Sequence, residues 1–174
     1  MLEKDMKELR QGKSSALANI YEETKKSVFS ICYSLMYDYS LAEDMMQDTY
    51  IKVRDNIDKY KPNTNAKSWI NVIARNICLN ELKKRNREVS VDFSKRPDNR
   101  GYDDIKIHDE SGIISIVVRQ LDENESRIVL MHTLGDISLK EIARLIEKPQ
   151  GTVRWQYSNA LKKLRKNLKK EELL

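Results

Sequence analysis

The stretch "EIARLIEKPQGTVRWQYSNALKKLRK" (residues 141–166) holds two runs of apolar residues at helical spacing, interrupted by Pro-Gln-Gly at 149–151. Apolar side chains that recur every three or four positions predict an amphipathic helix on each side of the interruption. Ser138 and Glu141 have the spacing of a capping box, which predicts the start of the first helix. A short helix, a tight turn and a longer basic helix form the helix-turn-helix pattern of DNA-binding proteins.

The second of these helices has an apolar side and a cationic side. On a helical wheel that begins at Val153, the apolar residues fall in one sector about 100° wide. From Lys148 to Lys170 the chain carries eight Lys/Arg and no Asp or Glu, which indicates a polyanionic partner; a merely solvated helix is the alternative. Arginine can read guanine, asparagine can read adenine, and an aromatic ring can pack on thymine methyls. The side expected to enter the major groove, here called the recognition face, consists of Arg154, Trp155, Ser158, Asn159 and Lys162.

Composition limits the class of protein. The 174 residues include 32 Lys+Arg and 27 Asp+Glu, a net charge of +5, with 40% hydrophobic residues, five Gly and three Pro, as in soluble helix-rich proteins. No apolar run approaches the roughly 18 residues of a membrane helix, and the charged start does not resemble a signal peptide. Cys32 and Cys78 lack metal-ligand spacing, so we expect reduced structural thiols in a cytoplasmic protein with no metal and no cofactor.

Helical periodicity continues along the chain without convincing strand alternation. The expected fold class is all-α: two small helical domains joined by a flexible acidic linker, the second a helix-turn-helix domain. We expect the first domain at 1–88, the linker at 89–112 and the second domain at 113–174. The expected helices lie at about 2–10, 14–37, 40–56, 65–87, 113–121, 122–134, 138–147 and from 149 to near the end.

The helix expected at 65–87 carries a second candidate nucleic-acid surface. Carboxamides can read base edges, aromatic rings can stack on unpaired bases and cations can hold phosphates. For the tryptophan alone, a place in the core is an equally good interpretation. The side chains that line up within about 60° on the wheel, here called the polar stripe, are Trp69, Asn76, Asn80, Lys83 and Arg87.

The helix expected at 40–56 differs in sign. Ser40, followed by a glutamate three residues later, predicts a capping box at its start. Its polar side, here called the acidic face, consists of Asp44, Gln47, Asp48 and Asp55. An acidic surface does not suit DNA, so it indicates a protein partner with a basic or polar groove, or else a solvated face.

Three stretches in this order resemble one family: "LAEDMMQDTYIKV" (41–53), "WINVIARNICLNELKKRNR" (69–87) and the run from "LDENES" to "LKKLRK" (121–166). They are similar to bacterial RNA polymerase sigma factors of the sigma-70 family, in the two-domain extracytoplasmic-function (ECF) type. The resemblance covers about residues 10–170. It implies one domain that binds core RNA polymerase and melts the minus-10 element, and a second domain that reads the minus-35 element.

The resemblance also implies roles for the three surfaces. Asp44, Gln47 and Asp48 would contact core polymerase, and the polar stripe would read the minus-10 element, with a base flipped into a pocket beside the loop at 58–67. The recognition face would read the minus-35 element. Because Trp155 and Asn159 stand where relatives often carry Ser and Arg, the promoter sequence is not specified by the resemblance.

The resemblance further implies partners. Promoter DNA, as duplex and as melted strand, and core RNA polymerase would be bound, and an anti-sigma factor, often anchored in the membrane, would hold the protein in check. No small-molecule substrate is expected.

Two alternatives explain less of the sequence. A helix-turn-helix regulator that acts independently of core polymerase leaves the acidic face and the polar stripe unexplained. An enzyme would need chemistry that the two histidines, His108 and His132, do not indicate, because no nucleophile elbow, phosphate-binding glycine loop or metal cluster accompanies them. A sigma factor with no chemistry of its own is therefore the favoured interpretation.

Overall fold

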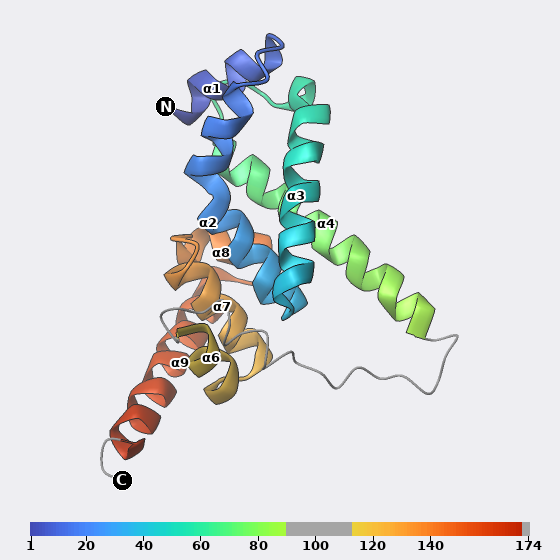
Figure 1. Ribbon diagram of the computed structural model, residues 1–174. Helices are drawn as coiled ribbons and strands as arrows, with labels where there is room; N and C mark the ends of the chain where they lie inside the picture. The colour runs from blue at the N-terminus through green and yellow to red at the C-terminus, as the bar shows by residue number, and fades with distance from the viewer. Residues whose placement is uncertain (90–112, 172–174) are drawn as a thin grey trace.

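The chain is helical throughout residues 1–89 and 113–171, the part that the structure describes, and these ranges contain no strand (Figure 1). This computed structural model confirms the expected all-α fold with two helical domains. The expected linker lies, beyond residue 89, outside the described residues. The helices of the first domain are α1 (Leu2–Arg10), α2 (Ala16–Met36), α3 (Tyr39–Asp55), the 3-10 turn η1 (Ile57–Lys59) and α4 (Ala66–Val89). Those of the second are α6 (Ile113–Gln120), α7 (Glu123–Thr133), α8 (Leu139–Leu145) and α9 (Gln150–Glu171).

The start of α3 differs from the expected one. Asp38, in extended conformation, accepts a hydrogen bond from the backbone N–H of Leu41 at 2.8 Å and so caps the helix. The prediction that Ser40 is the cap was wrong, since Ser40 lies inside the helix. The reason is the preceding turn: Tyr37 takes a left-handed conformation (φ 53°) that ends α2, so the chain enters α3 two residues earlier.

The caps of α7 and α8 follow the sequence pattern to different extents. At α7 the box is complete, because Asp122 accepts from the N–H of Glu125 at 3.0 Å and the Glu125 carboxylate accepts from the N–H of Asp122 at 3.4 Å. At α8 the Ser138 hydroxyl accepts from the N–H of Glu141 at 3.2 Å. The Glu141 carboxylate turns instead to the hydroxyl of Ser68 on α4.

Helix α2 is the centre of the molecule. It packs against α1, α3 and α4 of its own domain and against α7 of the other (Figure 1). Three buried residues, Ser27, Ser30 and Ser34, have small side chains that let neighbouring helices approach α2 closely. Each hydroxyl donates a hydrogen bond to a carbonyl of the preceding turn. The fully buried apolar side chains around α2 include Ile20, Val28, Ile31, Tyr33, Val53 and Ile70.

The two domains touch along two pairs of helices. Between α2 and α7, the Tyr37 hydroxyl donates to the carbonyl oxygen of Glu123 at 2.9 Å, and Arg127 Nε donates to the carbonyl oxygen of Ser34 at 3.4 Å. Gly135 meets the side chain of Ser30 so closely that an added Cβ would lie 2.1 Å from its Oγ. The absence of a side chain at 135 is therefore what lets the second domain lie on α2.

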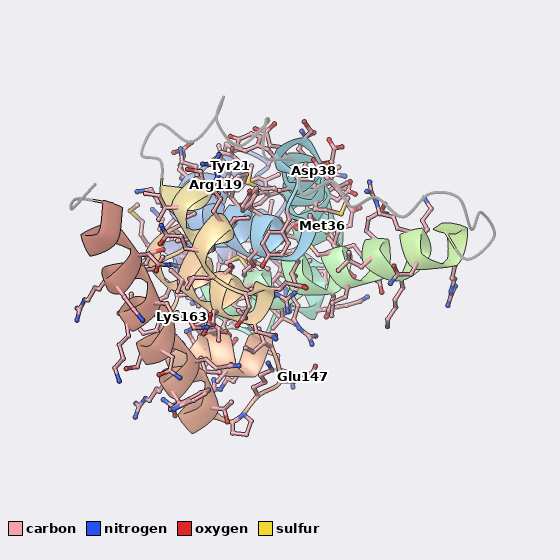
Figure 2. The ribbon with its side chains drawn as sticks, turned by 90° about the horizontal axis from the view of Figure 1, so that it is seen from below. Tyr21, Met36, Asp38, Arg119, Glu147 and Lys163 are labelled. Carbon is pink, nitrogen blue, oxygen red and sulfur yellow. The ribbon has the colours of Figure 1, made fainter. Side chains whose placement is uncertain are left out.

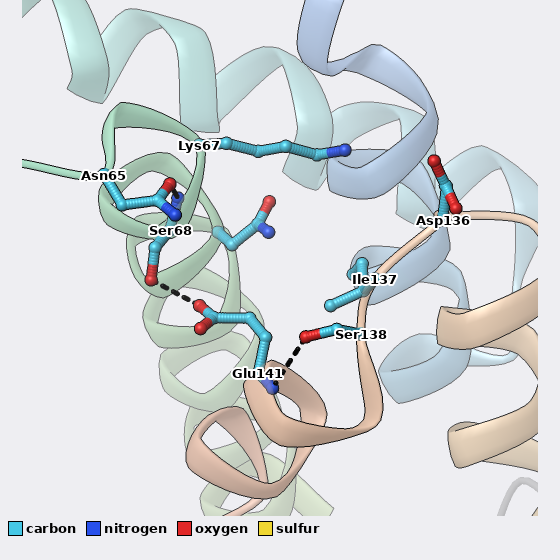
Figure 3. Close-up of a pocket in the computed structure, with 8 residues that line it drawn as sticks. Asn65, Lys67, Ser68, Asp136, Ile137, Ser138 and Glu141 are labelled. Carbon is cyan, nitrogen blue, oxygen red and sulfur yellow. Dashed lines mark hydrogen bonds between the residues drawn. The ribbon is translucent and has the colours of Figure 1, made fainter.

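The second pair of helices is α4 and α8. Beside the bond from Ser68 to Glu141, Arg75 Nη2 pairs with Glu147 Oε1 at 2.7 Å. Figure 3 shows Ser68 and Glu141 joined by their hydrogen bond, and both line a cavity of about 230 Å³ at this junction. The cavity is lined by Asn65, Lys67, Ser68, Asn71, Asp136, Ile137, Ser138 and Glu141.

The far ends of α4 and α9 project from opposite sides of the molecule, in the view of Figure 1 and in that of Figure 2. The domain contact therefore sets the two basic helices apart.

We expect Gly135→Ala to separate the domains, because the new Cβ would lie 2.1 Å from Ser30 Oγ and 3.0 Å from Ser30 Cβ on α2. Small-angle X-ray scattering should give a radius of gyration larger by at least about 2 Å, against roughly 16 Å for a compact chain of this length. Gly151→Ala is the matched control, since a Cβ there meets nothing within 4 Å. Equal radii for the two variants would contradict the close contact.

Candidate nucleic-acid and protein-binding surfaces

Helix α9 presents the recognition face because its other side is packed on the second domain. It begins at Gln150, one residue after the expected start, and the carbonyl of Pro149 accepts the N–H of Val153 at 3.2 Å. Val153 and Ala160 are fully buried. Tyr157, Leu161 and Leu164, expected in the core, are half-buried, and the Tyr157 ring meets the ring of His132 edge-on at 4.8 Å between centroids.

The recognition face lies at the surface. Arg154, Ser158 and Lys162 are exposed and Asn159 is half-buried. The Trp155 side chain is 66% exposed, the largest value of any aromatic among the described residues, so it is not part of the core. Packing therefore does not account for its position.

A hollow of about 460 Å³ separates the recognition face from the start of α7. Lys163 Nζ closes one side of it by pairing with both carboxylate oxygens of Glu125, at 2.6 and 2.7 Å, and lies 3.8 Å from Asp122. Lys163 is thus committed to α7. The hollow is lined by Asp122, Glu125, Trp155, Gln156, Asn159, Lys162 and Lys163.

The sequence did not predict that these acidic side chains lie beside the recognition face. The local signal at Asp122 and Glu125 predicted only a helix start, and the partner Lys163 lies 38 positions beyond Glu125.

Protonation in this cluster follows from its hydrogen bonds. The N–H of Glu125 holds the pKa of Asp122 below its ordinary value of 3.8. The hydrogen bond to Glu125 raises the pKa of Lys163 above its ordinary 10.5. Asp122 thus stabilises the fold above pH 3.8, a contribution lost as pH falls through its lowered pKa, and Lys163 does so below pH 10.5. Both groups are charged at neutral pH.

The polar stripe on α4 is largely exposed. Asn76, Asn80, Lys83 and Arg87 are at the surface, and a hollow of about 460 Å³ lies beside the last three of them and Lys84. Trp69 differs, because its side chain is half-buried. This agrees with the alternative interpretation that places Trp69 in the core.

The neighbours of the stripe are aromatic at one end and cationic near the middle. The Trp69 ring tilts against the ring of Tyr60 with centroids 5.4 Å apart. Arg75 Nη1 donates to Asn76 Oδ1 at 3.4 Å, while its other nitrogen pairs with Glu147 of the second domain. The domain contact therefore reaches the stripe itself.

The acidic face on α3 is exposed, at Asp44, Gln47, Asp48 and Asp55. An apolar side chain stands among them that the sequence reasoning missed: Ile51 is 48% exposed. The signal was present, since Ile51 follows Gln47 by four positions and Asp48 by three, and so shares their side of the helix. A groove of about 450 Å³ between α3 and α4 is lined by Met45, Asp48, Ile51, Lys52, Asp55, Ile77, Asn80, Glu81 and Lys84.

The cysteines are structural in the described first domain. Cys32 and Cys78 are both buried, and contact with the Cys78 thiol, together with burial, raises the pKa of Cys32. A thiol with a raised pKa and no exposure is inert. Over residues 1–89 and 113–171, no cluster of three or more His, Cys, Asp or Glu could hold a metal ion, and no helix is long and apolar enough to cross a membrane.

Comparison with known proteins matches a part of each helical domain to one family. Residues 20–88 match the family described as Sigma-70 region 2, and residues 117–166 match Sigma-70, region 4. The two matches cover both helical domains and more than half of the chain. The protein therefore belongs to the sigma-70 family of RNA polymerase sigma factors, in the ECF group, and its function is transcription initiation.

Relatives and solved structures extend over most of the chain. The ECF RNA polymerase sigma factor SigW of Bacillus subtilis (strain 168) is 22% identical over 97% of both chains. EcfG of Rhodopseudomonas palustris (strain TIE-1) is 24% identical over 79% of this chain and 77% of its own. The fold resembles the sigma factor RpoE from Bartonella quintana, solved with the anti-sigma factor NepR, at a TM-score of 0.66 and 21% identity over 87% of this chain and 96% of that one. It also resembles CnrH, solved with the cytosolic domain of CnrY, at a TM-score of 0.67 and 14% identity over 96% of both chains.

We expect Asp122→Ala to lower the free energy of unfolding by about 1 kcal/mol at pH 7, since it removes the cap of α7. Asp122→Asn keeps the cap and should change stability much less at pH 7, but it should flatten the loss of stability below about pH 3.8 because the low-pKa carboxylate is gone. Urea titrations followed by circular dichroism at pH 7 and pH 3 measure both effects. Asp136→Asn, an exposed carboxylate in the same domain, is the control. A steep acid limb in Asp122→Asn would show that another group governs it.

Proposed function

We propose that this protein brings core RNA polymerase to promoters, reads the minus-35 element with the recognition face of α9 and opens the minus-10 element with the polar stripe of α4. One observation carries the proposal. Two exposed surfaces with DNA-reading side chains and a separate acidic surface occur on three helices of one chain. The protein contributes binding energy, so it needs no cofactor and no small-molecule substrate. The polymerase carries out the chemistry of RNA synthesis.

The recognition face suits duplex DNA. Arg154 can bind guanine in bidentate fashion and Asn159 can bind adenine, while Lys162 can hold a phosphate. Trp155 stands free beside them and can pack on thymine methyl groups or on sugar. The hollow next to Trp155 gives room for a base edge or a bridging water, and the carboxylate of Asp122 on its other side repels phosphates. These features support readout of sequence as well as charge.

The polar stripe suits a melted strand. Asn76 and Asn80 carry donors and acceptors for a base edge, and Lys83 and Arg87 extend the stripe with charges for phosphates. Flipping a base from the stack costs a few kcal/mol, which such contacts can offset. Trp69, tilted against Tyr60, forms a wall at the start of the helix on which an unpaired base can stack.

The acidic face suits core polymerase. Asp44, Gln47 and Asp48 are the residues that the family resemblance assigns to this contact. Ile51 among them adds an apolar centre of the kind that fully buried interface patches have. A basic helical surface with an apolar side chain at its middle would complement this pattern.

The contact between the two domains limits how one molecule can bind the minus-35 and minus-10 elements together. The two elements lie about 25 base pairs apart by their names, or about 85 Å of duplex at about 3.4 Å per pair. In the structure α8 touches α4, and α4 and α9 project from opposite sides. We therefore propose that the domains separate when both elements are bound, and that the linker spans the distance.

An anti-sigma factor belongs to the proposal as a regulator. The folds of RpoE and CnrH, to which this chain is similar, were solved with NepR and with the cytosolic domain of CnrY. A partner of that class would bind the contacting domains and delay their separation. We place the protein in the cytoplasm, where chromosomal promoters and core polymerase are, with sequestration at the membrane if its anti-sigma factor is anchored there.

The test uses the full chain, core RNA polymerase and a library of templates with randomised upstream sequence. Sequencing of the run-off transcripts should recover a restricted set of promoters with two recurring blocks about 25 base pairs apart. The same templates with core polymerase alone are the control. Failure of the chain to bind core polymerase would overturn the proposal, and binding of duplex DNA without transcripts would favour an independent helix-turn-helix regulator.

We expect Asp44→Ala, Gln47→Ala and Ile51→Ala each to raise the Kd for core polymerase by roughly five- to tenfold, because each removes a contact at an interface. Their side chains are exposed, so the melting temperature of the free protein should stay within about 1 °C of the wild type. Glu23→Ala, exposed on α2, is the control. A variant that lowers the melting temperature and the affinity together would mark the face as structural.

We expect Trp155→Ser to change which minus-35 sequences are selected from the library, because the ring is the largest side chain on the recognition face. Affinity for core polymerase should not change. Ile116→Ser, an exposed apolar residue on α6 of the same domain, is the matched control. Unchanged sequence preference in Trp155→Ser would assign the ring to packing or to non-specific contact.

A further inference from the structure

The loop between η1 and α4, residues 60–65, is held from outside by a residue of the N-terminal helix. Glu3 on α1 accepts two hydrogen bonds from this loop. One comes from the Tyr60 hydroxyl at 2.5 Å and the other from the backbone N–H of Asn63 at 2.8 Å. The two carboxylate oxygens are used separately, so Glu3 bridges two points of the loop that lie three residues apart.

The carboxylate is presented by a well-anchored helix. Met6 and Leu9, on the inner side of α1, are 0% and 6% exposed, and α1 packs against α2, α4 and η1. A second contact joins Arg10 Nε to Asp58 at 3.7 Å, but both side chains are exposed and such a pair contributes little. Glu3 is therefore the polar contact through which α1 can order the loop.

The contact falls at the turn of the loop. Asn63 has a left-handed backbone (φ 63°), a conformation that asparagine adopts more readily than most other residues with a side chain. The N–H of this residue is the one that Glu3 accepts. The Tyr60 hydroxyl also lies 3.0 Å from the carbonyl oxygen of Thr64. Tyr60 therefore contacts both the Glu3 carboxylate and the far end of the loop.

On its inner side the loop is joined to the polar stripe. The Tyr60 side chain is buried, at 2% exposure, and its ring packs on Trp69. Glu3, Tyr60 and Trp69 thus form a continuous chain of contacts from α1 to the start of α4. The loop residues from Lys61 to Asn65 are exposed above it.

The charge of Glu3 is maintained by the same contacts. The Tyr60 hydroxyl, and then the Asn63 N–H, lower the pKa of Glu3 from its ordinary 4.5. The carboxylate is thus ionised at neutral pH, and charge-assisted hydrogen bonds are stronger than neutral ones.

We propose that Glu3 is a positioning residue for promoter opening: it fixes the loop at 60–65 and the Tyr60–Trp69 wall so that the site for an unpaired minus-10 base exists before DNA binds. The inference rests on the proposed function of the polar stripe and adds a residue outside it. An ordered loop loses less conformational entropy on binding, so pre-organisation appears as affinity for the melted strand. Duplex minus-35 DNA and core polymerase use other surfaces and should be indifferent to Glu3.

The test compares Glu3→Ala with Glu8→Ala in holoenzyme made from the full chain. Glu8 lies on the same helix, is half-buried like Glu3, and pairs with the exposed lysines Lys4 at 3.9 Å and Lys13 at 3.4 Å instead of with the loop. The probe is a single-stranded oligonucleotide with the non-template minus-10 block of a promoter selected from the library. We expect Glu3→Ala to weaken its binding by roughly five- to tenfold, in line with the loss of charged hydrogen bonds. Glu8→Ala, duplex minus-35 binding and core affinity should remain within about twofold.

Hydrogen exchange on the free protein gives a readout that does not depend on DNA. Glu3→Ala should speed exchange of the Asn63 amide by at least about tenfold, since its acceptor is gone, while amides in the middle of α2 keep their protection. Tyr60→Phe keeps the ring against Trp69 and removes the hydroxyl, so it should weaken oligonucleotide binding in the same direction. The double variant should be no weaker than Glu3→Ala, because both changes break one network.

The outcomes separate this inference from the proposed function. Asn76→Ala removes a base contact directly. If neither wild type nor Asn76→Ala distinguishes the minus-10 oligonucleotide from an unrelated one, the proposed function of the stripe fails and the inference fails with it. If Asn76→Ala weakens binding but Glu3→Ala and Tyr60→Phe behave like Glu8→Ala, Glu3 has no positioning role. A uniform loss of core, duplex and oligonucleotide binding in Glu3→Ala would also overturn it, as a general destabilisation.

Discussion

The close approach of the turn after α7 to α2, at Gly135 and Ser30, is the constraint on which the arrangement of the molecule depends. Because residue 135 has no side chain, α7 lies directly on the serine-lined side of α2. That contact brings α8 to the start of α4, where Glu141 and Glu147 find Ser68 and Arg75. Helices α4 and α9 then point to opposite sides (Figure 1). A requirement for space at one position thus decides how far apart the two basic helices stand.

Acidic and basic side chains are concentrated on different helices, which the net charge of the chain does not show. The exposed side of α3 is acidic, while α4 and α9 are basic. Within the second domain, Asp122 and Glu125 at the start of α7 bind Lys163, so one cation of α9 serves the fold while Arg154 and Lys162 remain exposed. General attraction to a polyanion is thereby reduced beside Trp155 and Asn159.

Local sequence patterns predicted the helices, their exposed sides and the cap at Ser138, because these depend on residues within one or two turns of each other. The cap of α3 was misplaced at Ser40 because the left-handed turn at Tyr37 has no strong sequence signal. The contacts that were missed join distant positions: Ser68 and Glu141 are 73 residues apart, Lys163 and Glu125 are 38 apart, and Tyr60 and Glu3 are 57 apart. Periodicity shows which side of a helix is apolar, but it cannot show which helix will cover it.

The carboxylate of Glu141 makes one hydrogen bond of the domain contact easy to replace. It belongs to a capping sequence, yet in the structure it leaves the N-terminus of its own helix and accepts a hydrogen bond from Ser68. When the domains part, it can swing back to the N–H of Ser138 and complete the box as Glu125 does in α7. One hydrogen bond is exchanged for another of the same kind, so that contact adds little to the free-energy difference between the two arrangements. For this hydrogen bond, the joined and the separated arrangements of α4 and α8 therefore have nearly equal free energies.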